Sequence, residues 1–286
     1  MILDGHIHIG DTAAKQEPFL DRLHQAGIDG GAVFSAFSDS FIPDAKPYEE
    51  RLDHVLEVCF GQKLLFPFFF FINPTADNAC EQVERAVESG IAGFKIICTT
   101  FYPSDPRCME TCRHIASLGK PVVFHSGILW DGINPSGRYN RPIEFEPLFG
   151  ISSLRFALAH ISWPWCDECI AVYGKLDSAV KCSGASGGMR LDNTPGTPKV
   201  YREETLNKVL MSGYDVLGKL YFGTDNFVED YNVAWARDWI AFDREIYEKL
   251  GLNRDQIERI FSRNLLDFIT EEPQGEALWE SSEHNK

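Results

Sequence analysis

The sequence is short of positive charge. Its 286 residues include 27 Lys and Arg against 42 Asp and Glu, which gives a formal net charge of −15 at pH 7. Nucleic-acid phosphates and anionic membrane surfaces repel such a chain. We therefore expect neither a nucleic acid nor a membrane as a partner. An anionic small molecule stays open as a substrate, because it responds only to local charge in a pocket.

Long apolar segments are also missing. The longest apolar run, residues 64–72, is far shorter than the roughly 18 residues that span a bilayer, and we expect a buried strand there. Residues 1–6, Met-Ile-Leu-Asp-Gly-His, lack the basic start and apolar stretch of a signal peptide. Without a secretory signal, the eight cysteines are expected to be reduced thiols. These features predict a cytoplasmic protein.

A glycine-rich phosphate loop, an internal repeat and low-complexity segments are absent as well. What the chain does contain is an alternation of short apolar runs with helical patterns of apolar spacing near 3.6. Strands are predicted at residues 2–9, 31–37, 64–71, 92–98, 121–125, 155–160, 178–182 and 220–224. Helices are predicted between them at 17–26, 49–59, 78–89, 106–118, 163–173, 203–217 and 233–250.

This alternation predicts an α/β fold with a parallel sheet, since near-continuous apolar strands are typical of sheets covered on both faces. Eight strands favour a closed (β/α)8 TIM barrel over an open sheet, and such a barrel typically needs about 250 residues. We expect one barrel domain over residues 1–269, with an extra helix at 253–269, and a polar, acidic tail over 270–286. The connection 126–153 is expected to be a loop with little regular structure.

Metal-ligand residue types follow four of the predicted strands. His6 and His8 are two apart in the first strand, so both side chains point to one face. His125, His160 and Asp225 directly follow or end three later apolar runs. Barrel active sites lie at the carboxyl ends of the strands, where all five side chains would meet. Imidazole nitrogen and carboxylate oxygen suit zinc and similar divalent metals.

The same segments carry a family resemblance. Asp-Gly-His-Ile-His at 4–8, Val-Val-Phe-His-Ser-Gly at 122–127, Leu-Ala-His at 158–160 and Phe-Gly-Thr-Asp at 222–225 together resemble the amidohydrolase superfamily. The nearest resemblance is to its amidohydrolase-2 group of metal-dependent TIM-barrel hydrolases and non-oxidative decarboxylases. It extends from about Leu3 to Phe268.

The resemblance implies that His6, His8, His125 and Asp225 bind one divalent metal ion, with His160 beside it. Zinc is the first candidate, with Mn, Fe and Co as alternatives, since these ions share such ligands. A metal in this setting lowers the pKa of a bound water. Asp225 would then act as a catalytic proton acceptor and donor, and His160 would orient the water or stabilise an oxyanion.

Lys95 lies in the apolar segment Gly-Phe-Lys-Ile-Ile at 93–97. Some members of the superfamily carry a carboxylated lysine at this place, where it bridges two metals. We expect an unmodified Lys95 beside one ion, in an ion pair or against the substrate. A second ion bridged by a carboxylated Lys95, with His125 and His160 as further ligands, is the alternative.

Two loops hold candidate substrate-binding residues. Trp130, Arg138 and Arg141 lie after the fifth predicted strand, and Arg190 lies in the segment 183–190 after the seventh. Guanidinium groups in such loops can clamp a carboxylate through paired hydrogen bonds. The pattern favours a small, anionic substrate.

The sequence thus predicts a metal-dependent hydrolase that cleaves an amide, lactone or related bond in a small, carboxylated molecule. The alternative is a lyase on the same scaffold, either a non-oxidative decarboxylase or a hydratase of an unsaturated or aromatic acid. A more remote alternative is a barrel that binds a metal or ligand without turnover. Apolar positions near Trp235 and Trp239 permit a homodimer without requiring one.

Overall fold

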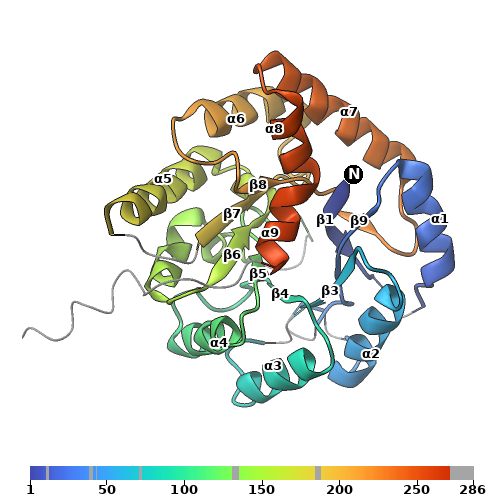
Figure 1. The fold of residues 1–286 in the computed structure, drawn as a ribbon. Helices are drawn as coiled ribbons and strands as arrows, with labels where there is room; N and C mark the ends of the chain where they lie inside the picture. The colour runs from blue at the N-terminus through green and yellow to red at the C-terminus, as the bar shows by residue number, and fades with distance from the viewer. Residues whose placement is uncertain are drawn as a thin grey trace, which may run out of the picture.

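The computed structural model describes residues 1–10, 13–38, 41–42, 44–70, 73–130, 135–183 and 188–270. Parallel strands form the centre of the molecule, and helices surround them (Figure 1). The strands are β1 (Leu3–His8), β2 (Gly30–Phe34), β3 (Leu65–Phe70), β4 (Gly93–Ile96), β5 (Val122–Phe124), β6 (Arg155–Leu158), β7 (Gly188–Asp192), β8 (Leu220–Tyr221) and β9 (Asn226–Phe227). This arrangement confirms the predicted TIM-barrel class of fold.

The sheet has the order β8-β7-β6-β5-β4-β3-β2-β1-β9. One short segment joins its two edges, because β8 pairs with β7 and β9 pairs with β1. Two residues between β8 and β9 also pair with β1. The Gly5 N–H donates to the Phe222 carbonyl at 2.9 Å, and the Asp225 N–H donates to the His6 carbonyl at 3.0 Å. Residues 220–227 therefore close the barrel.

Alternation along the strands divides the core into two parts. Phe34, Phe68 and Val123 belong to the cluster inside the barrel. Their neighbours in sequence, such as Val33 and Phe124, belong to the larger cluster between the strands and the helices. Successive side chains of a strand point to opposite faces, so covering both faces makes the strands apolar throughout.

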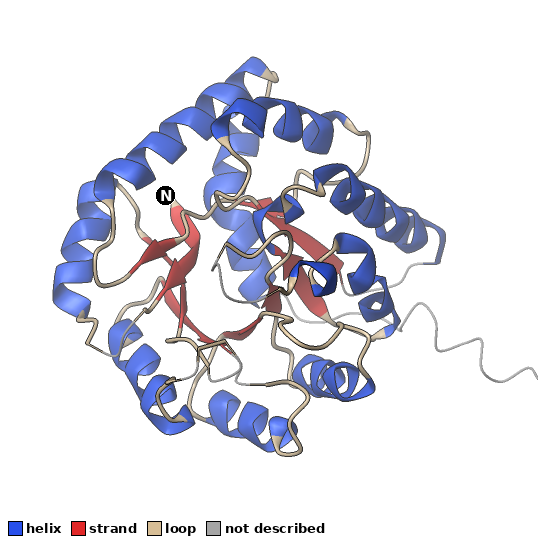
Figure 2. Cartoon of the chain, turned by 180° about the vertical axis from the view of Figure 1, so that it is seen from behind, coloured by secondary structure: helices blue, strands red, loops and turns tan. Residues whose placement is uncertain are grey.

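The surrounding helices are α1 (Gln16–Ala26), α2 (Tyr48–Cys59), α3 (Ala79–Glu88), α4 (Pro106–Ser117), α5 (Cys166–Ser183), α6 (Lys199–Met211) and α7 (Val233–Lys249). The predicted terminal helix is broken into α8 (Arg254–Glu258), a π-helical turn η4 (Arg259–Arg263) and α9 (Asn264–Thr270). Phe268 of α9 stacks on Tyr221, and its carbonyl accepts from Arg155 at the start of β6. This helix therefore covers the amino ends of the strands, and the opposite end is crossed by loops (Figures 1 and 2). Within the described residues, every helix is too short or too polar to cross a membrane.

The seventh predicted strand is wrong. Residues 178–182 continue α5, and β7 is Gly188–Asp192. The apolar residues at 179, 180 and 182 satisfy a strand by composition, yet Val180 continues the four-residue spacing of the buried Val172 and Leu176 and packs against the core. The real strand escapes detection because it places a buried arginine and a buried aspartate, Arg190 and Asp192, inside the barrel.

The connection after β5 also differs from the prediction of an irregular loop. It contains the 3-10 helices η1 (Gly137–Tyr139) and η2 (Pro142–Gly150). The second of these buries Phe145, Leu148 and Phe149 in the core. The predicted tail lies outside the described residues apart from Thr270, so the domain boundary at 269 stays a prediction.

Candidate metal centre and active site

Two histidines and one aspartate converge at the carboxyl ends of the strands. The Nε2 atoms of His6 and His8 in β1 lie 3.1 Å apart. The Asp225 Oδ1 lies 3.6 Å from the first of these atoms and 3.4 Å from the second. Ligands about 2.0–2.1 Å from a tetrahedral zinc ion lie roughly 3.3 Å from one another. The spacing therefore fits one ion of that size.

His6 is held in the orientation that a metal ligand needs. Its Nδ1 is 2.5 Å from Oδ2 of Asp192, the last residue of β7, and both side chains are buried. The other carboxylate oxygen, Oδ1, accepts from the backbone N–H of Thr194 at 2.8 Å and from its hydroxyl. A carboxylate that accepts from one ring nitrogen leaves the other free to bind a metal. The sequence prediction misses Asp192 because it misplaces the seventh strand.

Asp225 is positioned by a second buried carboxylate, that of Asp4 in β1. Asp4 accepts from the backbone N–H of Thr224 at 2.8 Å, from the Thr224 hydroxyl, and from the Tyr231 hydroxyl at 2.7 Å. These bonds fix the residue that precedes Asp225, which itself has a left-handed backbone with φ of 58°. A non-glycine residue in that conformation is costly and persists only where its surroundings hold it. Burial raises the pKa of Asp4 to about 6 against these lowering bonds.

His125 and His160 stand next to this triad. His160 begins a run of left-handed residues, with φ of 62°, in the 3-10 turn η3 (Ala159–Ser162) after β6. Its ring lies 5.2 Å from the rings of both His6 and His125. The buried Nε2 of His125 and Nδ1 of His160 have no hydrogen-bond partner among the described residues. Such orphaned nitrogens fit a site that receives an ion or substrate.

Lys95 of β4 completes the floor of the site. Its Nζ is 3.2 Å from Nε2 of His6 and faces the Phe34 ring at 5.0 Å. Burial lowers the pKa of Lys95 to about 8, although Asp192 and Asp225 oppose the shift. A buried amine with this pKa exchanges its proton more readily than an exposed lysine.

Burial sets the protonation of the imidazoles. It is the largest cause that holds the pKa of His6 and of His125 well below 6.5, and the nearby charge of Lys95 adds to it. Removal from bulk water would raise the pKa of Asp225, but the hydrogen bond with His8 and the electrostatic interactions with the His6 and His160 rings outweigh it and lower that pKa. Neutral imidazoles beside an ionised carboxylate are the protonation states that bind a divalent metal.

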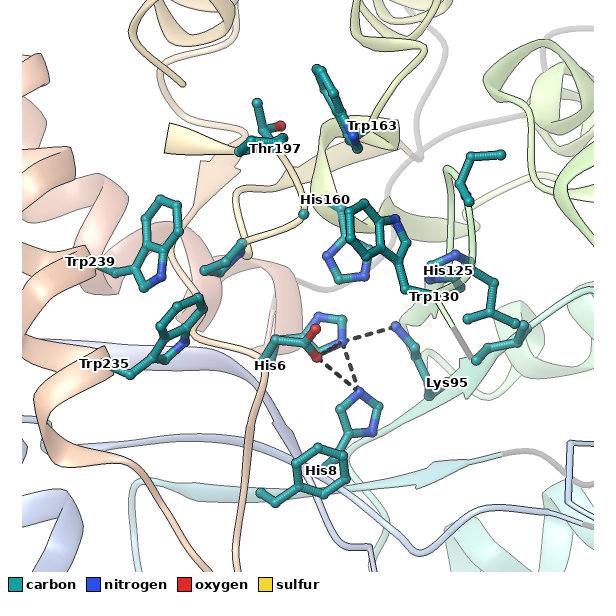
Figure 3. Close-up of a pocket in the computed structure, with 18 of the residues that line it drawn as sticks. His6, His8, Lys95, His125, Trp130, His160, Trp163, Thr197, Trp235 and Trp239 are labelled. Carbon is teal, nitrogen blue, oxygen red and sulfur yellow. Dashed lines mark hydrogen bonds and ion pairs between the residues drawn. The ribbon is translucent and has the colours of Figure 1, made fainter. Parts of the chain in front are cut away.

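These groups form the floor of a cavity of about 630 Å³. Figure 3 shows the imidazoles and Lys95 at its centre, with indole rings around them. Seven aromatic residues line the walls: Phe37, Phe41, Trp130, Trp163, Phe227, Trp235 and Trp239. The cavity is therefore polar at its floor and apolar on its walls.

A protein-family model described as Amidohydrolase matches residues 3–264. The chain belongs to the amidohydrolase family. This match confirms the resemblance given by the four sequence segments. The family is metal-dependent, and the His6, His8 and Asp225 triad is where such an ion fits.

Solved structures with the same fold differ widely from this amidohydrolase in sequence. A probable 2-pyrone-4,6-dicarboxylic acid hydrolase from Acinetobacter baumannii is 13% identical, with a TM-score of 0.61 over 94% of this chain and 98% of that one. A 2,6-dihydroxybenzoate decarboxylase from Rhizobium is 13% identical, with a TM-score of 0.64 over 94% and 97%. Amidohydrolase 2 from Bifidobacterium longum subsp. infantis is 14% identical, with a TM-score of 0.54 over 92% and 96%. A comparison with curated proteins finds no match.

The predicted substrate-binding residues are placed less uniformly. Lys95 and Trp130 line the cavity, and Trp130 is 76% exposed at its mouth. Arg138 stacks on its neighbour Tyr139, and Arg141 pairs with Glu168 on the surface.

Arg190 is not a loop residue, because it lies buried within β7, two residues before Asp192. The part of the cavity lining that the structure describes includes no arginine. A carboxylate clamp built from three arginines is therefore not what the described structure presents.

Proposed function

We propose that this amidohydrolase is a metal-dependent hydrolase that adds water across an amide, lactone or related bond of a small, planar, carboxylated molecule. The observation that carries the proposal is the Asp225 carboxylate beside two imidazoles at the polar floor of an aromatic cavity. A small planar molecule fits 630 Å³ between indole and phenyl rings.

His6, His8 and Asp225 would hold one divalent ion, with His125 as the fourth ligand and zinc as the first candidate. When bound, such an ion activates water and polarises a carbonyl group. The Oδ1 of Asp225 faces the two imidazoles, so Oδ2 is the oxygen placed to take a proton.

The reaction then needs two acts from the protein. Asp225 accepts a proton from the attacking water while the water oxygen bonds to the carbonyl carbon. It then gives that proton to the leaving nitrogen or oxygen as the bond between this atom and the carbonyl carbon breaks. The buried imidazole of His160 donates to the carbonyl oxygen while negative charge develops there. In total, the reaction consumes one water and cleaves one amide, lactone or related bond.

We assign to Lys95 the binding of the substrate carboxylate, which the sequence predicted for arginines. It is the one lysine among the described cavity-lining residues, which include no arginine. We propose that its ammonium group pairs with the substrate carboxylate, next to the reacting centre. A compact ammonium group suits a single carboxylate oxygen, whereas a guanidinium would bind two.

Decarboxylation is the second candidate, and the same lysine favours it. A carboxylate paired with Lys95 between apolar walls would lose much of its hydration. Asp225 would then need to deliver a proton to carbon as carbon dioxide leaves.

The test is to load the purified protein with zinc or manganese and supply pooled aromatic and aliphatic lactones, amides and acids. Hydrolysis predicts products whose masses together exceed that of the substrate by one water, without carbon dioxide, whereas carbon dioxide release without such products supports the lyase. Asp225→Asn should lower turnover by at least about a thousandfold, because the proton acceptor is lost. Asp230→Asn, which removes an exposed carboxylate from the loop after β9, is the matched control. If Asp225→Asn changes only ligand affinity, the barrel is a binding protein.

A further inference from the structure

The charged groups of the cavity are confined to its floor. The ionisable residues among its described lining are His6, His8, Lys95, His125, His160 and Asp225. The rest of the described lining is aromatic or aliphatic, apart from Gly196 and the hydroxyl group of Thr197. Figure 3 shows the same separation, with the imidazoles at the centre and indole rings around them. The lining can therefore match ligand charge at the floor and not at the walls.

The cations nearest to the walls are already paired. Lys199 and Arg202 of α6 lie 5.3 and 4.9 Å from the Trp239 ring, but neither is among the residues that line the cavity. Lys199 pairs with Asp238 and Arg202 pairs with Asp243, both on α7. The internal segments outside the described residues contain no lysine, arginine or histidine in their sequence, and their charged residues are all aspartates. These segments therefore offer no cation for a second ligand carboxylate.

The apolar walls are accessible to a ligand. Trp130, Ile128 and Trp235 line the cavity and are 76%, 42% and 41% exposed. Exposed apolar side chains around a concave site indicate an apolar ligand. A cavity of about 630 Å³ lies in the size range of drug-sized ligands, so one ring and its substituents fit between these walls.

The two kinds of surface discriminate between substituents on such a ring. A methyl group against the walls gains free energy, because its apolar area leaves water. A carboxylate in the same place loses its hydration without gaining an opposite charge, which costs far more than the methyl group gains. The discrimination needs no contact that is specific to one wall residue.

We propose that this enzyme selects monocarboxylates, whose single carboxylate lies at the floor while an uncharged, apolar body lies between the aromatic walls. A second carboxylate on that body is rejected, because the walls would leave it unpaired. The inference deepens the proposed function and rests on it in one respect, that this cavity binds a carboxylated substrate.

Five simple acids test the inference by binding alone: benzoate, 3-methylbenzoate, 4-methylbenzoate, isophthalate and terephthalate. Calorimetry with the zinc-loaded protein should show that a methyl group at position 3 or 4 tightens binding about fourfold, as expected for one buried methylene-sized group. A carboxylate at either position should weaken binding at least about tenfold relative to benzoate. A dicarboxylate that binds as tightly as benzoate would overturn the proposal, and so would binding of none of the five.

A cation added to the wall should change the selectivity. Trp130→Arg alters a position that is 76% exposed, so the fold does not depend on its side chain. The affinity for isophthalate or terephthalate should rise about fivefold relative to benzoate, because a guanidinium pairs with the second carboxylate. Phe60→Arg is the matched control, since it adds the same charge at an 80% exposed aromatic position between α2 and β3, at the amino ends of the strands. An unchanged ratio in Trp130→Arg, or the same change in both variants, would contradict the proposal.

The selectivity and the proposed reaction fail separately. If the five acids bind in the expected order and no lactone, amide or acid is turned over, the proposed reaction is refuted and the selectivity stands. If the enzyme hydrolyses a dicarboxylated lactone faster than its monocarboxylated counterpart, the reaction stands and the selectivity is refuted.

Discussion

Asp192→Asn is the most informative single change, because Asp192 lies outside the ligand set and acts through His6. In the native protein one carboxylate oxygen accepts from His6 Nδ1 at 2.5 Å, and the other accepts two hydrogen bonds from Thr194. An asparagine has one acceptor oxygen and one NH2 group, and it cannot satisfy both sides.

Either arrangement of the amide harms the site. If its oxygen keeps His6, the NH2 group faces the Thr194 backbone N–H and two donors oppose each other. If its oxygen keeps Thr194, the NH2 group faces His6 Nδ1, which must then become the acceptor. The His6 proton moves to Nε2, the atom that lies 3.1 Å from Nε2 of His8 and is needed for the metal.

The expected magnitude follows from the bond that is lost. A hydrogen bond to a charged group contributes about 1.5–3 kcal/mol, and loss of such a partner to a ligating histidine typically weakens metal affinity about 10–100-fold. We expect zinc affinity to fall within that range, measured by competition with a fluorescent chelator. Asp267→Asn, which removes an exposed carboxylate paired with Arg259, should leave the affinity unchanged. A folded Asp192→Asn protein that binds zinc as tightly as the wild type would refute the assigned role of His6 as a ligand held by Asp192.

Three further results are expected from the same structure. Tyr231→Phe removes a donor to Asp4 and should lower the free energy of unfolding by about 1–2 kcal/mol in a urea titration, with no change expected if that bond is unimportant. Gly196→Ala would place a Cβ 2.7 Å from the Cβ of His160, so kcat/KM should drop at least about tenfold while the fold persists, and full activity would show that the loop yields. Cys182 is exposed, whereas burial raises the pKa of Cys59 and Cys169, so a thiol reagent at pH 8 should modify Cys182 first and Cys182→Ser should abolish the fast phase.

The convergence of His6, His8 and Asp225 was predictable because the barrel strands are covered on both faces. A histidine follows the apolar run of β5 and that of β6, and β1 ends in two histidines at alternate positions, so the histidines mark the carboxyl ends of these strands. Asp225 likewise comes at the end of a short segment that begins with the apolar strand residues Leu220 and Tyr221. Their convergence needs only the parallel topology, which places all carboxyl ends at one rim.

The parts that were not predictable depend on contacts between distant segments. β7 buries charge inside the barrel, so its sequence does not resemble a covered strand, and Asp192 was lost with it. The sequence predicts that Arg141 binds an anionic substrate, but the fold places Glu168 beside it and the two side chains form an ion pair.

The segment that joins the two edges of the barrel has a consequence for how the enzyme is made. It carries Asp225, while His6 and His8 lie on β1 at the other edge. A nascent chain can thus display both histidines long before their acidic companion has been translated. A chain that stops before the eighth strand holds both histidines without Asp225, and it also lacks the hydrogen bonds by which residues 222 and 225 join β1.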